Sequence, residues 1–434
     1  MLTRRELVQT AMAFSVWPSL RPSAAAALKQ IPSEGAPDDE TFWTYVRSEF
    51  ELTPEFTNLV SVVRGNFTRA NREIAFNEAT RLNQLPAPLP DLNYRRETRK
   101  KVAGFIGASA ESIALLRNTT EGVTTVLSNW PLKPGDEILT SSAEHGPFYD
   151  TLAQRAARDR VTIRQFHYPA PVTSAQAILE AIDQALTART RLVMIGQVVL
   201  LGQINQVRPI ADLVHSKGAK LLVDGVLGLA HVPTDVKAMD CDFYAAGFHK
   251  FACGPRATAV FYVRPDLVSQ LPPLFGNLDE DARGFPKPKW NSNSMDKYEV
   301  FGAHPEGQFY ALPNAIDFLT GIGVDRIQAR YFYLTSRWMS RAQRLPKFRA
   351  AVTLDPAHCA GLVAWELAGT DPGVVRKILR ENRVRNGRTE TYAGFFGIPQ
   401  NAPRFLFIAN AAPFTSVADV DRLADTIEAA AGKS

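Results

Sequence analysis

The sequence predicts an α/β protein with a mostly parallel β-sheet in a large domain and a small α+β domain at the C-terminal end. Between positions 111 and 263, short apolar segments alternate with helical ones, which is typical of a parallel sheet covered on both faces. The 434 residues are 45% hydrophobic and 21% charged, enough for a sizeable core. The predicted strands are Ile113–Leu116, Glu137–Thr140, Thr162–Phe166, Arg191–Val199, Lys220–Asp224, Phe243–Ala246 and Ala259–Val263.

Helical patterns and turn signals divide the rest of the chain. Residues 28–90 form an N-terminal segment with helices, 91–305 the large domain, and 306–434 a helical linker with the small domain. The segment Gly284–Asn293, rich in Gly, Pro and Lys, is expected to be a long functional loop. Strands of the small domain are predicted at Leu362–Leu367 and Arg404–Ala409.

Residues 1–27 have the parts of a secretory signal. Arg4 and Arg5 precede an apolar run that ends at Trp17, and small residues follow at Ser23–Ala27. The paired arginines predict the twin-arginine (Tat) type, so we expect export of the folded protein by the Tat translocase to the periplasm. The alternative is a cytosolic leader that happens to hold two arginines. No later stretch is apolar for about 18 residues, so no membrane span is expected in the mature chain.

The composition argues against several classes of function. The net charge is only +5, and no Lys/Arg cluster is interleaved with aromatic residues, so nucleic-acid binding is not expected. The three cysteines, Cys241, Cys253 and Cys359, are widely spaced and odd in number. They predict neither a disulfide framework nor a metal site.

Asp224 and Lys250 are the most informative pair. Asp224 ends a predicted buried strand, and Lys250 follows the next strand in Gly247-Phe-His-Lys250. A lysine amine can form a Schiff base with an aldehyde cofactor, and a carboxylate can keep a pyridine nitrogen protonated. Ligands of parallel sheets bind at the carboxyl ends of the strands, where both residues fall. Alone, an Asp at a strand end followed by a Lys in a turn is usually just solvated charge.

Further motifs occur in a characteristic order. They are Leu116-Arg-Asn-Thr-Thr-Glu121, Pro134-Gly-Asp-Glu-Ile138, Glu144-His145, Leu222-Val-Asp-Gly225, Gly247-Phe-His-Lys250, Ile322–Arg330 and Arg404. From Asn58 to the C-terminus the chain resembles the class V aminotransferase branch of fold-type I pyridoxal phosphate enzymes, above all isopenicillin N epimerase-like proteins, including exported ones that tailor siderophores. The resemblance implies pyridoxal 5'-phosphate as cofactor, Lys250 and Asp224 as catalytic residues, and a homodimer with active sites between the subunits.

The resemblance also implies roles for other residues. Thr119, Thr120 and His249 would bind the cofactor phosphate, His145 would stack on the pyridine ring, and Arg404 would bind the substrate α-carboxylate. Each has a simpler alternative. The two threonines could merely cap a helix, His145 could be an ordinary surface histidine, and Arg404 a solvated edge-strand arginine.

The chain departs from the family pattern at several positions. Leu227 stands where relatives carry Gln or His, Gly247 where they carry a hydroxyl residue, and Ala303 where they carry Thr or Gln. The early segment Val60–Arg64 also differs from the usual Asn-Gly motif. We infer that the cofactor chemistry is retained and that the substrate has changed.

The expected function is a pyridoxal phosphate enzyme acting at the α-carbon of an amino-acid or peptide substrate. Transamination, epimerisation and elimination share the first step and stay open. Cysteine desulfuration is the weakest branch, because Val384–Tyr392 contains no cysteine. Tailoring of a secondary metabolite or siderophore is expected. The alternative from another class is a non-catalytic binding or scaffold protein with this fold.

Overall fold

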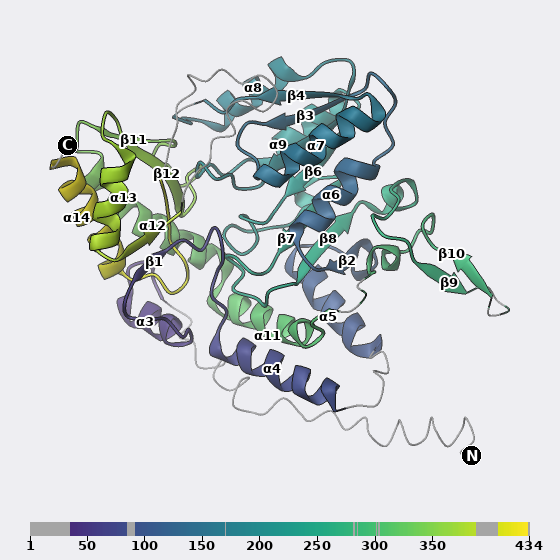
Figure 1. Ribbon diagram of the computed structural model, residues 1–434, viewed down its shortest axis with the longest axis horizontal. Coiled ribbons are helices and arrows are strands. Elements are labelled where there is room, and N and C mark those ends of the chain that lie inside the picture. Colours follow the sequence, from purple (N-terminus) through teal and green to yellow (C-terminus); the bar gives the residue numbers. More distant parts are fainter. Residues whose placement is uncertain are drawn as a thin grey trace.

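The computed structural model describes residues 35–84, 92–169, 171–280, 283, 285–300, 302, 304–387 and 407–432. Its centre is a seven-stranded sheet in the order β2-β8-β7-β6-β5-β3-β4 (Figure 1). Only β8 runs antiparallel to its neighbours, so the predicted mostly parallel sheet is confirmed. The strands are β2 (Ile113–Leu116), β3 (Glu137–Ser141), β4 (Thr162–Phe166), β5 (Thr190–Gly196), β6 (Lys220–Asp224), β7 (Phe243–Gly247) and β8 (Ala259–Val263).

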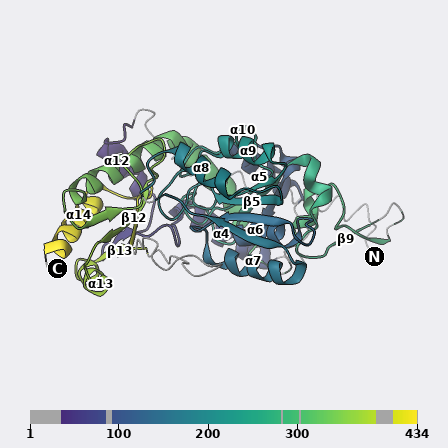
Figure 2. The same ribbon diagram turned by 90° about the horizontal axis from the view of Figure 1, so that it is seen from above.

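Helices cover both faces of this sheet, because each strand alternates its apolar side chains between two cores. In β5, Val193 and Ile195 belong to the core beneath α8 and α9, whereas Leu192 and Met194 belong to the core beneath α6 and α7. Figure 2 shows the two helical layers on opposite sides of the sheet. The helices are α6 (Thr119–Asn129), α7 (Gly146–Asp159), α8 (Ala175–Ala185), α9 (Val207–Ser216) and α10 (Val236–Met239).

A three-stranded antiparallel sheet forms the C-terminal unit, with β12 between β11 and β15. Trp365 stacks on Phe407 at 4.8 Å between ring centroids, which joins two of these strands. The elements are β11 (Phe348–Ala350), β12 (Leu362–Leu367), β15 (Phe407–Asn410), α11 (Gly307–Ile322), α12 (Val324–Ala342), α13 (Pro372–Glu381) and α14 (Val417–Gly432). The predicted strand at 404–409 is therefore present from Phe407, and Arg404 lies outside the described residues.

The N-terminal segment ties the small sheet to the large one. It comprises α3 (Glu40–Ser48), β1 (Thr57–Leu59) and α4 (Arg69–Asn83), and α5 (Leu92–Phe105) begins the large domain. Strand β1 pairs in parallel with β13 (Val384–Asn386). After β1 the chain crosses to the large domain, where the Gly65 amide donates to the His249 carbonyl at 2.8 Å. A Cβ on Gly65 would lie 2.1 Å from the Lys250 carbonyl oxygen, so only glycine permits this approach.

The segment expected to be a loop at Gly284–Asn293 contains part of a hairpin. β9 (Leu278–Glu280) pairs with β10 (Pro286–Pro288), and the hairpin projects from the body of the molecule (Figure 1). The loop prediction was wrong for Pro286–Pro288. The two prolines there argue against a strand in the sequence, but proline is tolerated in a short edge strand such as β10. Short 3₁₀ turns occur at Ala110–Ser112, Pro265–Gln270 and Met295–Tyr298. Among the described helices, none has the length and apolar character needed to span a membrane.

Candidate active site

Asp224 and Lys250 lie together at the carboxyl edge of the sheet. β6 pairs with β7 so that Asp224 lies opposite Ala245, and the turn after β7 brings Lys250 back towards the carboxylate. Asp224 is buried and accepts a hydrogen bond from the Val226 amide at 2.9 Å. Burial raises the pKa of Asp224 to about 6, with Val226 and Lys250 opposing the rise. Burial lowers the pKa of Lys250 to about 8 despite the attraction of Asp224.

The N-terminus of α6 opens towards the same site. Asn118 caps this helix by accepting from the Glu121 amide at 2.9 Å. Thr119 therefore does not serve as the cap; its Oγ1 accepts from the Gly247 amide at 2.8 Å and keeps its own proton to donate. Thr120 is exposed in the first turn. Unpaired amides and the helix dipole at this end suit a phosphate group.

His249 fills the space that a hydroxyl side chain at position 247 would need. A Cβ on Gly247 would lie 2.8 Å from His249 Nδ1 and 3.2 Å from Thr119 Oγ1. Glycine at 247 thus lets the imidazole lie beside Thr119 at the helix N-terminus. Burial, with added repulsion from Lys250 and Arg256, lowers the pKa of His249 to about 4, so the ring is neutral at pH 7.

His145 stands at the first turn of α7, as its N-cap residue, and its ring meets Phe148 edge-on at 5.5 Å. Partial burial and the charge of Lys250 lower the pKa of His145, which places the imidazole near the lysine. A neutral ring next to Lys250 is suited to stacking on an aromatic cofactor. The structure therefore gathers Thr119, His145, Asp224, His249 and Lys250 in one site.

Of the two positions Leu227 and Ala303, where the chain departs from the family pattern, the structure describes only Leu227. Leu227 is buried in the hydrophobic core, and its carbonyl accepts from the ring of His231 at 2.9 Å. The second ring nitrogen of His231 accepts from the Gly361 amide at 3.0 Å, which links the large domain to the small one. Ala303 lies outside the described residues.

Glu144 is a site residue to which the sequence reading gave no role of its own. Its carboxyl group is buried and accepts from Ser141 Oγ at 2.6 Å and from the Gly196 amide at 3.3 Å. Burial raises the pKa of Glu144 to about 8, and the charge of Asp224 adds to the rise. The sequence signal was an acidic residue three positions after a buried strand, next to His145.

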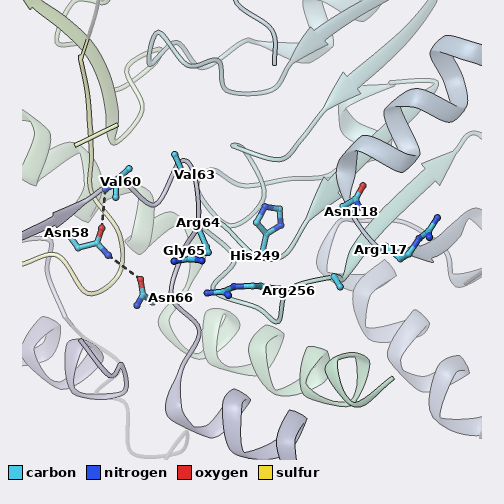
Figure 3. A pocket seen from close by; sticks show the side chains of 11 residues that line it. Asn58, Val60, Val63, Arg64, Gly65, Asn66, Arg117, Asn118, His249 and Arg256 are labelled. Carbon is cyan, nitrogen blue, oxygen red and sulfur yellow. Dashed lines mark hydrogen bonds between the residues drawn. The ribbon is translucent and has the colours of Figure 1, made fainter. Parts of the chain in front are cut away.

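A cavity of about 720 Å³ opens beside His249, the neighbour of Lys250 in the chain (Figure 3). Three of its lining residues are arginines, and none is acidic. Neither Arg64 nor Arg256 was singled out from the sequence. The lining residues are Asn58, Val60, Val63, Arg64, Gly65, Asn66, Arg117, Asn118, His249, Arg256 and Ala257. No group of residues able to hold a metal ion occurs in the described parts of the chain.

These residues fit pyridoxal phosphate. The α6 N-terminus with Thr119, Thr120 and His249 can hold a phosphate, and Asp224 offers a buried carboxylate for the pyridine nitrogen. Lys250 supplies an amine whose pKa is low enough for it to be partly uncharged near neutral pH.

Comparisons with known proteins agree with this fit. A cysteine desulfurase of Dickeya dadantii (strain 3937) is 32% identical over 285 residues, which are 62% of this chain and 65% of that protein. The isopenicillin N epimerase of Streptomyces clavuligerus is 26% identical over 408 residues, 90% of this chain and 99% of that protein. The crystal structure of the cysteine desulfurase CsdA from Escherichia coli has the same fold, with a TM-score of 0.75 at 22% identity over 90% of this chain and 98% of that chain.

The family model for aminotransferase class V matches residues 93–391, which include Thr119, Thr120, Glu144, His145, Asp224, His249 and Lys250. The chain therefore belongs to the aminotransferase class V family and is a pyridoxal phosphate enzyme of fold type I.

Proposed function

We propose that the enzyme removes and returns a proton at the α-carbon of an amino-acid moiety, with Lys250 as the base. The observation that carries the proposal is the partly buried position of Lys250 near Asp224, where desolvation brings the lysine pKa to about 8 despite the attraction of Asp224. A base whose pKa lies near the working pH is the most effective proton carrier. When bound, pyridoxal phosphate supplies an aldehyde that captures the substrate amine and a ring that takes up the electron pair left at the α-carbon.

The other residues bind and orient. Thr119, Thr120 and His249 would hold the phosphate, and His145 would cover one face of the ring. Asp224 would keep the pyridine nitrogen protonated, because an ionised carboxylate in a dry site favours a positive partner. Glu144, kept neutral by burial, leaves Asp224 without a competing negative charge. The carboxylate role of Arg404 stays a prediction.

Transaminase, epimerase and lyase chemistry are favoured over cysteine desulfuration. All three cysteines are buried, and burial raises the pKa of each thiol, to about 12 for Cys253 and Cys359. The sequence from Val384 to Phe407 contains no cysteine. A desulfurase needs a reactive thiolate that reaches the substrate, which these thiols do not provide.

A substrate larger than a free amino acid is supported by the cavities. A second cavity of about 400 Å³ shares Asn58, Val60 and Asn66 with the main one. The joined space would accept an amino-acid residue within a peptide or secondary metabolite, such as a siderophore. A periplasmic location after Tat export is part of the proposal. It is supported by Arg4 and Arg5 and the apolar run after them, which lie outside the described residues.

A homodimer is the expected assembly. Large apolar side chains are exposed around the β9–β10 hairpin; they are Phe275, Leu278, Phe285 and Trp290, with exposed fractions from 41% to 65%. A two-fold pair is the commonest closed assembly and would cover such a surface. Sedimentation tests this, and a fully active monomer would contradict it.

Solvent hydrogen exchange tests the function. Holoenzyme incubated in D₂O with a panel of D- and L-amino acids and siderophore peptides should place deuterium at the α-carbon of its substrates, detected by mass spectrometry. Lys250→Ala should abolish the exchange. A protein that binds no cofactor, or that exchanges equally well without Lys250, would return us to the non-catalytic alternative or to another base.

A further inference from the structure

The cavity beside His249 is lined by three positively charged side chains. Arg64, Arg117 and Arg256 line it, and no acidic side chain does. The charge of Arg117 is already balanced, since its guanidinium contacts the Glu121 carboxylate at 3.1 Å through two nitrogens. Arg64 and Arg256 make no hydrogen bond or ion pair with any described residue. Two unbalanced guanidinium groups therefore face one cavity.

The backbone holds Arg64 in place from one side. Its neighbour Gly65 donates to the His249 carbonyl and lies against the Lys250 carbonyl, so this segment cannot move independently of the lysine. On its other side, Asn58 donates to Asn66 at 3.2 Å, which closes the segment into a loop (Figure 3). The backbone that carries Arg64 is thus tied to the segment that holds Lys250, and the exposed Arg64 side chain lines the cavity.

Arg256 is presented by the turn that follows Lys250. The next residue, Ala257, has a φ of 58°, a left-handed conformation that disfavours residues with a side chain. The charge of Arg256 reaches His249, where it lowers the imidazole pKa together with Lys250. Such backbone strain next to a functional lysine is retained where the surrounding structure holds it.

The position of the two arginines separates them from the phosphate end. In Figure 3, Asn118 and Arg117 lie at one end of the cavity, Asn58 and Asn66 at the other, and Arg64 and Arg256 between them. The phosphate belongs at the α6 N-terminus, beside Asn118. The end near Asn58 leads into the second cavity, where the rest of an extended substrate would lie.

We propose that Arg64 and Arg256 bind a second anionic group of the substrate, a carboxylate on its side chain, and so select acidic amino-acid moieties. Guanidinium groups suit carboxylates because they offer paired N–H donors in one plane. This inference rests on the proposed function, since it assumes that the amino group of the same molecule reaches the cofactor.

The test is binding to holoenzyme, followed by the change in cofactor absorption. The probes are L-glutamate and L-2-aminoadipate, compared with the uncharged L-glutamine and L-norleucine. Wild type should be half-saturated at lower concentrations of the two acids than of the two uncharged probes. Arg64→Gln and Arg256→Gln should each raise the half-saturating concentration of the acids about tenfold, as for loss of a charged hydrogen bond, and leave the uncharged probes within about twofold.

Arg208→Gln is the matched control, because Arg208 is exposed on α9, where it pairs with Asp212 at 2.9 Å. It removes the same charge and should bind all four probes as wild type does. The proposal is overturned if holoenzyme shows no preference for the acids, including the case in which it binds none of the probes. It is also overturned if the Arg64 and Arg256 variants weaken acids and uncharged probes equally, which would assign them to the α-carboxylate.

Cofactor affinity and sedimentation of the same variants give two further outcomes. Weaker pyridoxal phosphate binding would assign the arginines to the cofactor phosphate, and loss of the dimer would assign them to the subunit interface. Either result overturns the inference while leaving the proposed function intact. Failure of wild type to bind pyridoxal phosphate at all would instead overturn the proposed function.

Discussion

Replacing Glu144 by Gln should remove a pH dependence from the stability of the apo-protein. The pKa of Glu144 rises from 4.5 to about 8 on folding, so between these values the native state keeps a proton that the unfolded chain loses. The unfolded state then binds fewer protons, and stability falls as pH rises through this window. One pKa unit corresponds to about 1.4 kcal/mol, so wild type should lose roughly 3 kcal/mol of unfolding free energy between pH 4.5 and pH 7 from this group, and roughly 4 kcal/mol by pH 8.

Glutamine has the same shape, still accepts from Ser141 and Gly196, and has no proton to lose in this range. Urea unfolding of wild type and Glu144→Gln, followed by tryptophan fluorescence from pH 4.5 to pH 8.5, measures the difference. The free energy of unfolding of Glu144→Gln, relative to that of wild type, should increase steadily as pH rises. Glu111→Gln, at an exposed turn, controls for loss of a surface acid. A constant difference between Glu144→Gln and wild type across the range would refute the burial argument.

Four further predictions concern the cofactor and export. Lys250→Ala should lose the visible absorption band that borohydride bleaches and all turnover; wild-type activity would refute the assignment. Asp224→Ala should keep the band but lose most activity, because an unprotonated ring is a poor electron acceptor; unchanged turnover would rule this role out. Gly247→Ser should weaken cofactor binding about tenfold, since its Cβ would lie 2.8 Å from the neighbouring imidazole, and equilibrium dialysis would show tighter binding if this is wrong. Replacing Arg4 and Arg5 by Lys should keep the protein in the cytoplasm, and unchanged periplasmic fractions would reject the Tat route.

The strands were predictable from local pattern because buried parallel strands are short apolar runs between turns. β2, β4, β6 and β8 begin and end at the predicted residues, and β12 does so in the small sheet. β5 was predicted three residues too long at its C-terminal end (Val199 against Gly196), since the apolar run continues beyond Gly196 into a turn. An apolar run shows burial, but it does not show where hydrogen bonding to the next strand stops.

The chemistry of the site was predictable only where one residue type at a strand end carries it. The catalytic roles of Asp224 and Lys250 could be predicted from their positions after two strands. The neutral state of Glu144 depends on its distance from Asp224 and from water, which no local pattern records. Arg64 and Arg256 are isolated arginines in the sequence, and a loop crossing between distant segments brings them to one cavity. In the sequence, Gly247 indicates the loss of a hydroxyl contact with the cofactor phosphate. In the structure, the imidazole of His249 occupies the space that a side chain at position 247 would fill.

The pairing of β1 with β13 has a consequence for how the protein is made. Thr57 lies opposite Val384. Strand β1 is therefore synthesised early but can pair only after β13 has emerged, near the end of translation. The loop Val60–Asn66 directly follows β1 in the chain. It contributes Arg64 to the cavity, and its Gly65 packs against the backbone of His249 and Lys250. A nascent chain can therefore form the central sheet while still on the ribosome, but this wall of the active site must close afterwards. Truncated or stalled chains would be inert even though they contain both Asp224 and Lys250.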